Sequence, residues 1–379
     1  MRIAVLGGGP AGLYFAYLWK RRHPHSDVSV YEQNPADATF GFGVVFSERA
    51  LEFLRADDPE TVNFIAPHME VWESLTLDLK GEQIVLDGVG FSAIGRLKFL
   101  QLLQQRVCSV GVEPKFASPI RSLEELGEVD LIVGADGLNS MVRRSFADEF
   151  VTSLAFASNK FIWYGTSKRF ETLSQTFVAT DLGSFTAHHY RYAPNMSTFL
   201  IECDSQTWMR YGFATKTGEE CKDICEQIFA DTLDGHPLLA NSSVWRNFPW
   251  IWNDRWYVRN MVLVGDALHT AHFSIGSGTR LAIEDATALV KALEAESEVT
   301  RALARYEAER RPVVRRFVEA AKASADWYEN FPAHMRLGLL DFAYGYITRS
   351  GRVDDARLRK IAPDFMARLD ASRRASTAP

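Results

Sequence analysis

The chain has 379 residues, of which 47% are hydrophobic and 12% aromatic, enough for a large core and more than one domain. Its formal net charge of −6 argues against a general nucleic-acid-binding protein, and it contains no run of about eighteen apolar residues that would cross a membrane. The four cysteines lack the spacing of a zinc site or a disulfide framework, so we expect a cytoplasmic protein without a metal site.

The N-terminal pattern predicts a βαβ unit. Residues 2–6 form a β-branched run, 11–20 an apolar helix and 27–31 a second strand. Between the first strand and the helix lies GGGPAG, where glycines let backbone N–H groups approach a pyrophosphate at a helix N-terminus. By itself this loop is compatible with FAD, NAD or NADP, or with an ordinary turn. The residues assigned to it are Gly7, Gly9, Pro10, Ala11 and Gly12.

An acid closes the second strand. Glu32 stands about twenty residues after Gly12, the spacing at which a carboxylate accepts hydrogen bonds from a ribose 2′-hydroxyl. A 2′-phosphate would be repelled there, so Glu32 favours FAD or NAD over NADP. The adjacent Gln33 is assigned to the same cofactor site.

The next segments alternate between strands and helices. Short strands are predicted within 69–89, an amphipathic helix over 96–111 and an apolar strand over 129–133. Asp136 and Gly137 follow that strand, with Arg143 a few residues later. A carboxylate and a guanidinium at the carboxyl edge of a parallel sheet can fix ribityl hydroxyls and phosphates. The alternative is an N-capping aspartate beside an ordinary surface arginine.

A β-meander is predicted from about 161 to 203, because FIWYGTS, TFVAT, SFTAHHYRY and STFLIEC alternate with period two. We assign Tyr164, Thr166, His188 and Tyr190 to strands that cover the substrate. His188 and Tyr190 are the candidates for orienting the substrate, since their polar groups can hydrogen-bond a ring hydroxyl or amine. The alternative is that these side chains only pack.

A third motif begins near residue 260. The strand MVLVGDALH ends at Gly265 and Asp266, and Gly276 and Gly278 precede a long helical stretch from about 280 to 327. The N-terminus of that helix can face a polar ring or a phosphate, although a capped turn has the same pattern.

Together, GGGPAG, GADGLNSMVR and VGDALH resemble, in order and spacing, the three flavin motifs of single-component FAD aromatic hydroxylases of the p-hydroxybenzoate hydroxylase type. The resemblance implies an FAD enzyme that uses NADH or NADPH and O2, and hydroxylates an aromatic ring through a C4a-hydroperoxide. It also implies that Arg96 contacts FAD.

A narrower resemblance is to the salicyloyl-CoA 5-hydroxylase and anthraniloyl-CoA monooxygenase group, with similarity to the tryptophan-derivative hydroxylase of violacein biosynthesis. It rests on FGFGVVFSERAL, NKFIWYGTSKRF, STFLIEC, HFSIGSGT and YITRSGRV. It implies that Phe40, Phe42, Val45 and Phe273 line the substrate pocket. The broader family usually has proline at the position of Phe273, and the narrower group shares HFSIG.

The fold class that follows is α/β, with a discontinuous Rossmann-like FAD-binding domain, an inserted antiparallel β-sheet substrate domain and a helical C-terminus. The expected ranges are 1–68, 92–155 and 256–300 for the FAD-binding domain, 69–91 and 156–255 for the substrate domain, and 301–379 for the C-terminal region.

The leading functional hypothesis is 5-hydroxylation of salicyloyl-CoA, with an aryl-CoA thioester as the small-molecule partner. The basic rim for CoA is assigned to Arg49, Lys168, Arg169 and the C-terminal arginines. One alternative is hydroxylation of a free indole or another aromatic metabolite, and another is a non-catalytic FAD-binding sensor. The choice between NADH and NADPH, the position hydroxylated and the oligomeric state stay open.

Overall fold

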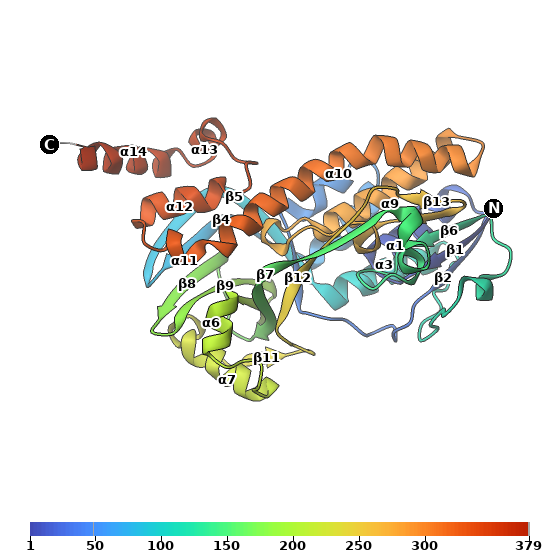
Figure 1. Ribbon diagram of the computed structural model, residues 1–379. Helices are drawn as coiled ribbons and strands as arrows, with labels where there is room; N and C mark the ends of the chain where they lie inside the picture. The colour runs from blue at the N-terminus through green and yellow to red at the C-terminus, as the bar shows by residue number, and fades with distance from the viewer. Residues whose placement is uncertain (48, 378–379) are drawn as a thin grey trace.

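The computed structural model describes residues 1–47 and 49–377, and the side chains of 1–47 and 51–375. A five-stranded sheet forms one half of the molecule, in the order β13-β14-β6-β1-β2 (Figure 1). Its pairings are parallel except that of β13 with β14. The strands are β1 (Arg2–Leu6), β2 (Asp27–Tyr31), β6 (Leu131–Gly134), β13 (Tyr257–Val258) and β14 (Met261–Leu263).

Helices bury this sheet. Residues 11–19 of α1 (Pro10–Arg22) are all buried, because α1 packs against both the sheet and α9 (Gly278–Ala295). α3 (Arg96–Ser109) packs on α1 as well. Since the carboxyl ends of parallel strands lie at one edge of a sheet, the loops after β1, β6 and β14 meet there. Shorter helices are α2 (Pro59–Ile65), α4 (Met141–Ser145) and α5 (Ala147–Phe150).

A second, nine-stranded sheet is mainly antiparallel, with the order β11-β7-β10-β9-β8-β4-β5-β3, and β12 paired with β7. Only β4 and β8 pair in parallel. Its strands are β3 (Gly43–Phe46), β4 (Glu70–Leu79), β5 (Glu82–Gly95), β7 (Thr152–Thr166), β8 (Leu173–Thr180), β9 (Gly183–Ala193), β10 (Met196–Cys203), β11 (Leu238–Ala240) and β12 (Arg246–Asn253).

Different helices cover the two faces of this large sheet. One face packs against α6 (Ser205–Arg210), α7 (Gly218–Ile228) and α8 (Ala230–Leu233). Part of the other face packs against the C-terminal helices, which Figure 1 shows in orange and red. These are α10 (Val299–Glu329), α11 (Phe331–His334), α12 (Leu339–Thr348), α13 (Asp355–Ile361) and α14 (Pro363–Thr377).

Two boundaries differ from the expected domain ranges. β3 lies within 1–68, which we assigned to the FAD-binding domain, yet it pairs with β5 in the large sheet. β5 itself continues to Gly95, past the expected boundary at residue 91. The reason is that the segment from residue 40 to 46 crosses from one sheet to the other, so local sequence patterns do not mark where it changes partner.

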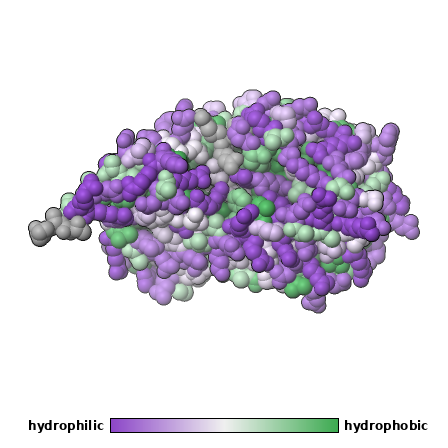
Figure 2. All heavy atoms as spheres, turned by 90° about the horizontal axis from the view of Figure 1, so that it is seen from above, coloured by the Kyte–Doolittle hydropathy of each residue, from purple (hydrophilic) through white to green (hydrophobic). Residues whose placement is uncertain are grey.

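The surface seen in Figure 2 is mostly polar, with apolar atoms scattered between charged groups. Within the described residues, none of the helices combines the length and the hydropathy needed to cross a bilayer.

Candidate functional site

A cavity of about 620 Å³ lies between the two sheets. The glycine loop after β1, the loops after β6 and β14 and the N-terminus of α9 line one side, and β7, β9 and β10 line the other. A second cavity of about 640 Å³ adjoins it and shares Gly41, Arg96 and Asn241 with it. The three sequence motifs therefore border one space.

The first loop is shaped by glycines. Gly7 has φ +110°, and a Cβ there would stand 2.2 Å from the carbonyl oxygen of Ala135. A Cβ on Gly12 would stand 2.1 Å from the Gly7 oxygen. Gly7 and Gly12 thus bring the loop against the end of β6, whereas Gly9, Pro10 and Ala11 line the cavity.

Glu32 lies beside this loop. Its carboxylate accepts the Gly8 N–H at 2.7 Å and the Asn34 N–H at 2.8 Å. The carboxylate is thus fixed next to the glycines, where a ribose of a bound dinucleotide would lie. The adjacent Gln33 is exposed and does not line either cavity.

In the second motif, one carboxylate oxygen of Asp136 has no hydrogen-bond partner among the described residues. Asp136 Oδ2 accepts the Met141 N–H at 2.6 Å, and Oδ1 is buried without a hydrogen-bond partner among the described residues. Burial raises the pKa of Asp136. Gly137 lines the cavity. Arg143 instead donates to the carbonyl oxygen of Ala267 at 2.8 Å, so it joins the second and third motifs and is not a ligand group.

The third motif is held by a buried ion-pair network. The N–H of Gly265, which has φ +61°, donates to Asp285 Oδ2 at 3.1 Å. Asp285 also pairs with His269 and Arg310, each at 2.8 Å. Burial disfavours the ionised form of Asp285, but its interactions with His269 and Arg310 outweigh this effect and lower the pKa of Asp285. The network fixes the turn that places Asp266 at the cavity.

Asp266 and Arg96 both line the cavity and interact electrostatically. Asp266 is exposed to the cavity, yet the surrounding protein atoms desolvate its carboxylate and raise its pKa, and the Arg96 charge opposes that shift. Burial lowers the pKa of Arg96, whose guanidinium forms no hydrogen bond or ion pair within the described part of the chain. A half-buried cation that lines a cavity without a hydrogen-bond or ion-pair partner among the described residues is a fitting contact for an anionic cofactor group.

The loop before α9 completes this side. Gly276, with φ +58°, packs against Val45, and both residues line the cavity with Gly278. The start of α9 therefore borders the cavity, which is the position that a helix N-terminus needs to bind a polar ring or a phosphate.

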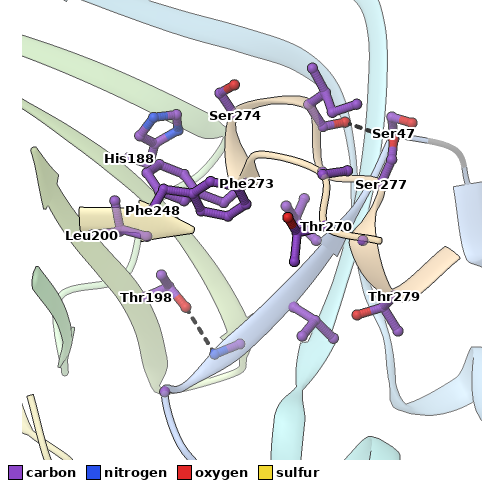
Figure 3. Close-up of a pocket in the computed structure, with 18 of the residues that line it drawn as sticks. Ser47, His188, Thr198, Leu200, Phe248, Thr270, Phe273, Ser274, Ser277 and Thr279 are labelled. Carbon is purple, nitrogen blue, oxygen red and sulfur yellow. Dashed lines mark hydrogen bonds between the residues drawn. The ribbon is translucent and has the colours of Figure 1, made fainter. Parts of the chain in front are cut away.

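Across the cavity lies an aromatic chamber (Figure 3). The centroid of the Phe273 ring lies 4.9 Å from the ring centroid of Phe161, 5.7 Å from that of His188 and 6.0 Å from that of Phe248. His188 Nε2 is buried and has no hydrogen-bond partner among the described residues. Burial, with the nearby Arg349 charge, lowers the pKa of His188 well below its ordinary value. The imidazole is neutral at physiological pH and can accept or donate one hydrogen bond to a ligand.

Tyr190 also lines the cavity, but its hydroxyl donates to the Gly43 carbonyl oxygen at 3.0 Å. The Gly43 N–H in turn donates to Thr198 Oγ1 at 2.9 Å, as Figure 3 shows. Tyr190 therefore anchors the 40–46 segment. Of the residues assigned there, Phe40 lines the main cavity, whereas Phe42 packs on Gly165 and lines the second one.

Tyr164 and Thr166 lie on the other face of the sheet. Both are buried, and Tyr164 packs in the cluster formed with α7 and α8. The residues of β7 that line the cavity are Phe161 and Trp163, which have the opposite alternation along the strand. Period-two alternation defines two faces, and here both are apolar because both are covered. The sequence therefore did not indicate which face is the substrate face.

Sequence reasoning also missed several residues of the chamber. These residues come from three strands and share an apolar or aromatic side chain that faces the cavity: Phe161, Trp163, Leu200 and Phe248. The register could have found them, since Leu200 pairs with both Trp163 and His188. With His188 as a pocket residue, that pairing places Leu200 and Trp163 on the same face, whereas Phe248 on β12 is not fixed by it.

The arrangement fits a flavin dinucleotide. A glycine loop that leaves no room for a Cβ, an unpaired Arg96 and the N-terminus of α9 border one cavity. The unpartnered Asp136 oxygen is buried beside them, between the lining residues Ala135 and Gly137 in the chain. The described residues hold no cluster of three or more metal-ligating side chains. The chamber opposite can hold an aromatic ring.

Comparison with known proteins agrees with this geometry. The model of the FAD-binding-domain family matches residues 111–321. Salicyloyl-CoA 5-hydroxylase from a Streptomyces species is 42% identical over 363 residues, covering 92% of this chain and 70% of that protein. Protodeoxyviolaceinate monooxygenase from Chromobacterium violaceum is 33% identical over 374 residues, covering 96% of both.

A solved structure of 2-methyl-3-hydroxypyridine-5-carboxylic acid oxygenase superposes with a TM-score of 0.72, covering 92% of this chain and 95% of that chain at 18% identity. At that identity the likeness concerns the fold alone. It confirms the predicted fold class, and the family match confirms the resemblance inferred from the three motifs.

Proposed function

Because the chain belongs to the FAD-dependent monooxygenases that hydroxylate aromatic substrates, we propose that its substrate is an aryl-CoA thioester, with salicyloyl-CoA hydroxylated at ring position 5 as the best candidate. The observation that carries the proposal is the aromatic chamber, where the unpartnered His188 Nε2 faces the loop that precedes α9. The sequence relationship to a salicyloyl-CoA 5-hydroxylase supports the choice of ring and thioester.

The protein's part in the reaction is binding, orientation and exclusion of water. When bound, FAD supplies electron transfer from NADH or NADPH and the activation of O2. Gly9, Glu32, Asp136, Arg96 and the N-terminus of α9 would hold it.

The chamber residues act on the ring. Phe161, Phe248 and Phe273 supply apolar walls that keep water out. Neutral His188 accepts a hydrogen bond from the phenolic hydroxyl, which increases electron density on the ring and favours attack by an electrophilic oxygen.

Rapid-mixing kinetics test the proposal. Purified enzyme with FAD is mixed with NADH or NADPH, with and without salicyloyl-CoA, and flavin reduction and product are followed by absorbance and mass spectrometry. We expect the thioester to accelerate flavin reduction and to gain one oxygen atom. Free salicylate and an indole acid serve as comparison substrates. Faster reduction and hydroxylation with either of these, and neither with salicyloyl-CoA, contradict the proposal.

We also propose a cytoplasmic location, supported by four free thiols in the described structure, which suit a reducing compartment.

A further inference from the structure

The main cavity continues past the aromatic chamber. It crosses the face of the large sheet to β5, where Gly88, Val89, Gly90 and Phe91 line it opposite the 346–357 segment. We propose that this end, which we call the bulge end, binds the phosphopantetheine arm of the CoA thioester. The proposal rests on the proposed function, because it assigns a place to the part of that substrate that is not hydroxylated.

The walls of the bulge end suit an alkyl chain. Six apolar side chains line it and come from β4, β5, β8 and the α12–α13 segment: Leu75, Val89, Phe91, Leu173, Ile347 and Val353. An aromatic ring held beside His188 and Phe273 does not need this space, which lies over strands on the other side of β9 from the chamber.

A bulge in β5 offers backbone polar groups. Trp72 pairs with Phe91 and Ser74 with Asp87, so residues 88–90 of β5 stand opposite the single Glu73 and have no partner in the register. Backbone N–H and C=O groups of a bulge that borders a cavity can bind the two amides of a pantetheine arm.

The bulge is held in this conformation by α13. Gly88 has φ +78°, and a Cβ on it would stand 2.1 Å from the carbonyl oxygen of Ile361 at the end of α13. The bulge and the α12–α13 segment therefore form the two walls of one channel.

Arginines lie along the α12–α13 wall. Arg349 donates to the carbonyl oxygen of Ser274 at 2.8 Å, and Arg352 lies 3.5 Å from Ser277 Oγ, so both reach the loop before α9. Arg357 is exposed, lines the cavity and makes no side-chain hydrogen bond or ion pair within the described part of the chain. It is an available cation at the outer end, where the phosphates of CoA would lie.

The other basic residues assigned to CoA lie elsewhere. Lys168 pairs with Asp234 at 2.7 Å and Arg169 with Glu171 at 3.2 Å, and neither lines a cavity described above. The side chain of Arg49 is outside the described residues. Of the basic residues assigned to CoA, the C-terminal arginines are therefore the ones placed to bind its phosphates.

Substitution of Arg357 tests the assignment. In Arg357→Ala we expect the KM for salicyloyl-CoA to rise about tenfold, the loss of one charge-assisted contact at an exposed position, with kcat unchanged. The KM for S-salicyloyl-pantetheine, which lacks phosphates, stays at the wild-type value. Lys360→Ala removes one exposed charge from the same helix, away from the cavity, and leaves both KM values unchanged.

Titration of CoA alone, followed by calorimetry, separates this assignment from the proposed function. If the wild type binds CoA, and this binding weakens in Arg357→Ala and persists in Lys360→Ala, the result supports the assignment of the CoA arm to the bulge end. Two outcomes contradict the assignment of the bulge end and leave the proposed function intact, provided that the wild type turns over salicyloyl-CoA. In the first, the KM for salicyloyl-CoA is the same in the wild type and Arg357→Ala. In the second, Arg357→Ala raises the KM equally for salicyloyl-CoA and S-salicyloyl-pantetheine. No CoA binding and no turnover by the wild type overturns both.

Discussion

Two adjacent histidines show how one position along a strand decides a residue's role. His189 Nε2 bonds Thr176 Oγ1 at 2.8 Å, its ring stacks on Phe199, and burial lowers its pKa to about 3. His188 points the other way, into the aromatic chamber, where Nε2 has no partner among the described residues. Only His188 can therefore act on a bound ring.

We expect His188→Leu to lower the rate of hydroxylation by about 100-fold, the usual size of the loss of one group that assists proton movement. His188→Gln keeps a hydrogen-bonding group and should retain more activity. Because the His188 imidazole is already neutral at pH 6.5, it should not produce a step in the pH profile of kcat near that pH. The profiles of the wild type and His188→Gln should therefore have the same shape there. The measurement is the rate of product formation with NADH or NADPH, and equal rates in both variants and the wild type would exclude a role for His188.

At the scale of elements, Asp285 joins parts of the chain that carry the cofactor loop. It lies on α9, accepts the Gly265 N–H of the turn after β14, and pairs with Arg310 on α10. The sequence assigned Gly265 and Asp266 to a cofactor-binding motif, with a capped turn as the alternative, and did not indicate what holds them in place. The structure adds that the turn is positioned by two helices.

We expect Asp285→Asn to destabilise the protein by about 1.5–3 kcal/mol, because it removes a buried charge-assisted contact to Arg310, which keeps Glu284 as a carboxylate partner. Thermal unfolding measures this, and the ratio of FAD to purified protein should fall as the turn loosens. His269→Gln, which removes only one contact to Asp285, tests the same network if the first variant does not fold. Unchanged FAD content in both variants would show that the network does not position the cofactor loop.

At the scale of the whole molecule, burial of histidines sets the dependence of stability on pH. His188, His189 and His272 have lowered pKa values, to about 3 for the latter two. The unfolded chain binds protons at these positions below about pH 6.5, and the folded chain does not. Stability is therefore lost as the pH falls below 6.5, by up to about 1.4 kcal/mol per pH unit for each histidine.

Glu202 acts in the opposite direction. Burial raises its pKa to about 7, so its contribution to stability is present at low pH and lost as the pH rises through 7. Between pH 7.5 and pH 5.5 the stability lost through the three histidines exceeds the stability gained through Glu202. We therefore expect a lower Tm at pH 5.5 than at pH 7.5. Differential scanning calorimetry checks this, and in Glu202→Gln the fall in Tm should be steeper because the opposing group is gone. His25→Gln, at an exposed position, is the control, and a pH-independent Tm would contradict the argument.

Much of the cofactor site could be predicted from the sequence, because its determinants are local. A glycine loop, an acid at the end of the next strand and a Gly-Asp turn each depend on a few neighbouring residues. The substrate side could not be predicted to the same degree. Tyr164 and Thr166 were placed on the substrate side, and they lie on the opposite face; the role of Trp163 depends on pairing between β7 and β10.

The sequence by itself determined the family, the FAD cofactor, the order of the three motifs and the class of reaction. Only the tertiary structure decided which face of the large sheet borders the cavity and that the cavity continues to a bulge in β5. It also decided that the Tyr190 hydroxyl donates to Gly43, whereas His188 Nε2 has no hydrogen-bond partner among the described residues. The physical reason is that strand alternation and helical periodicity report burial, whereas a site between two sheets depends on which distant segments cover each face.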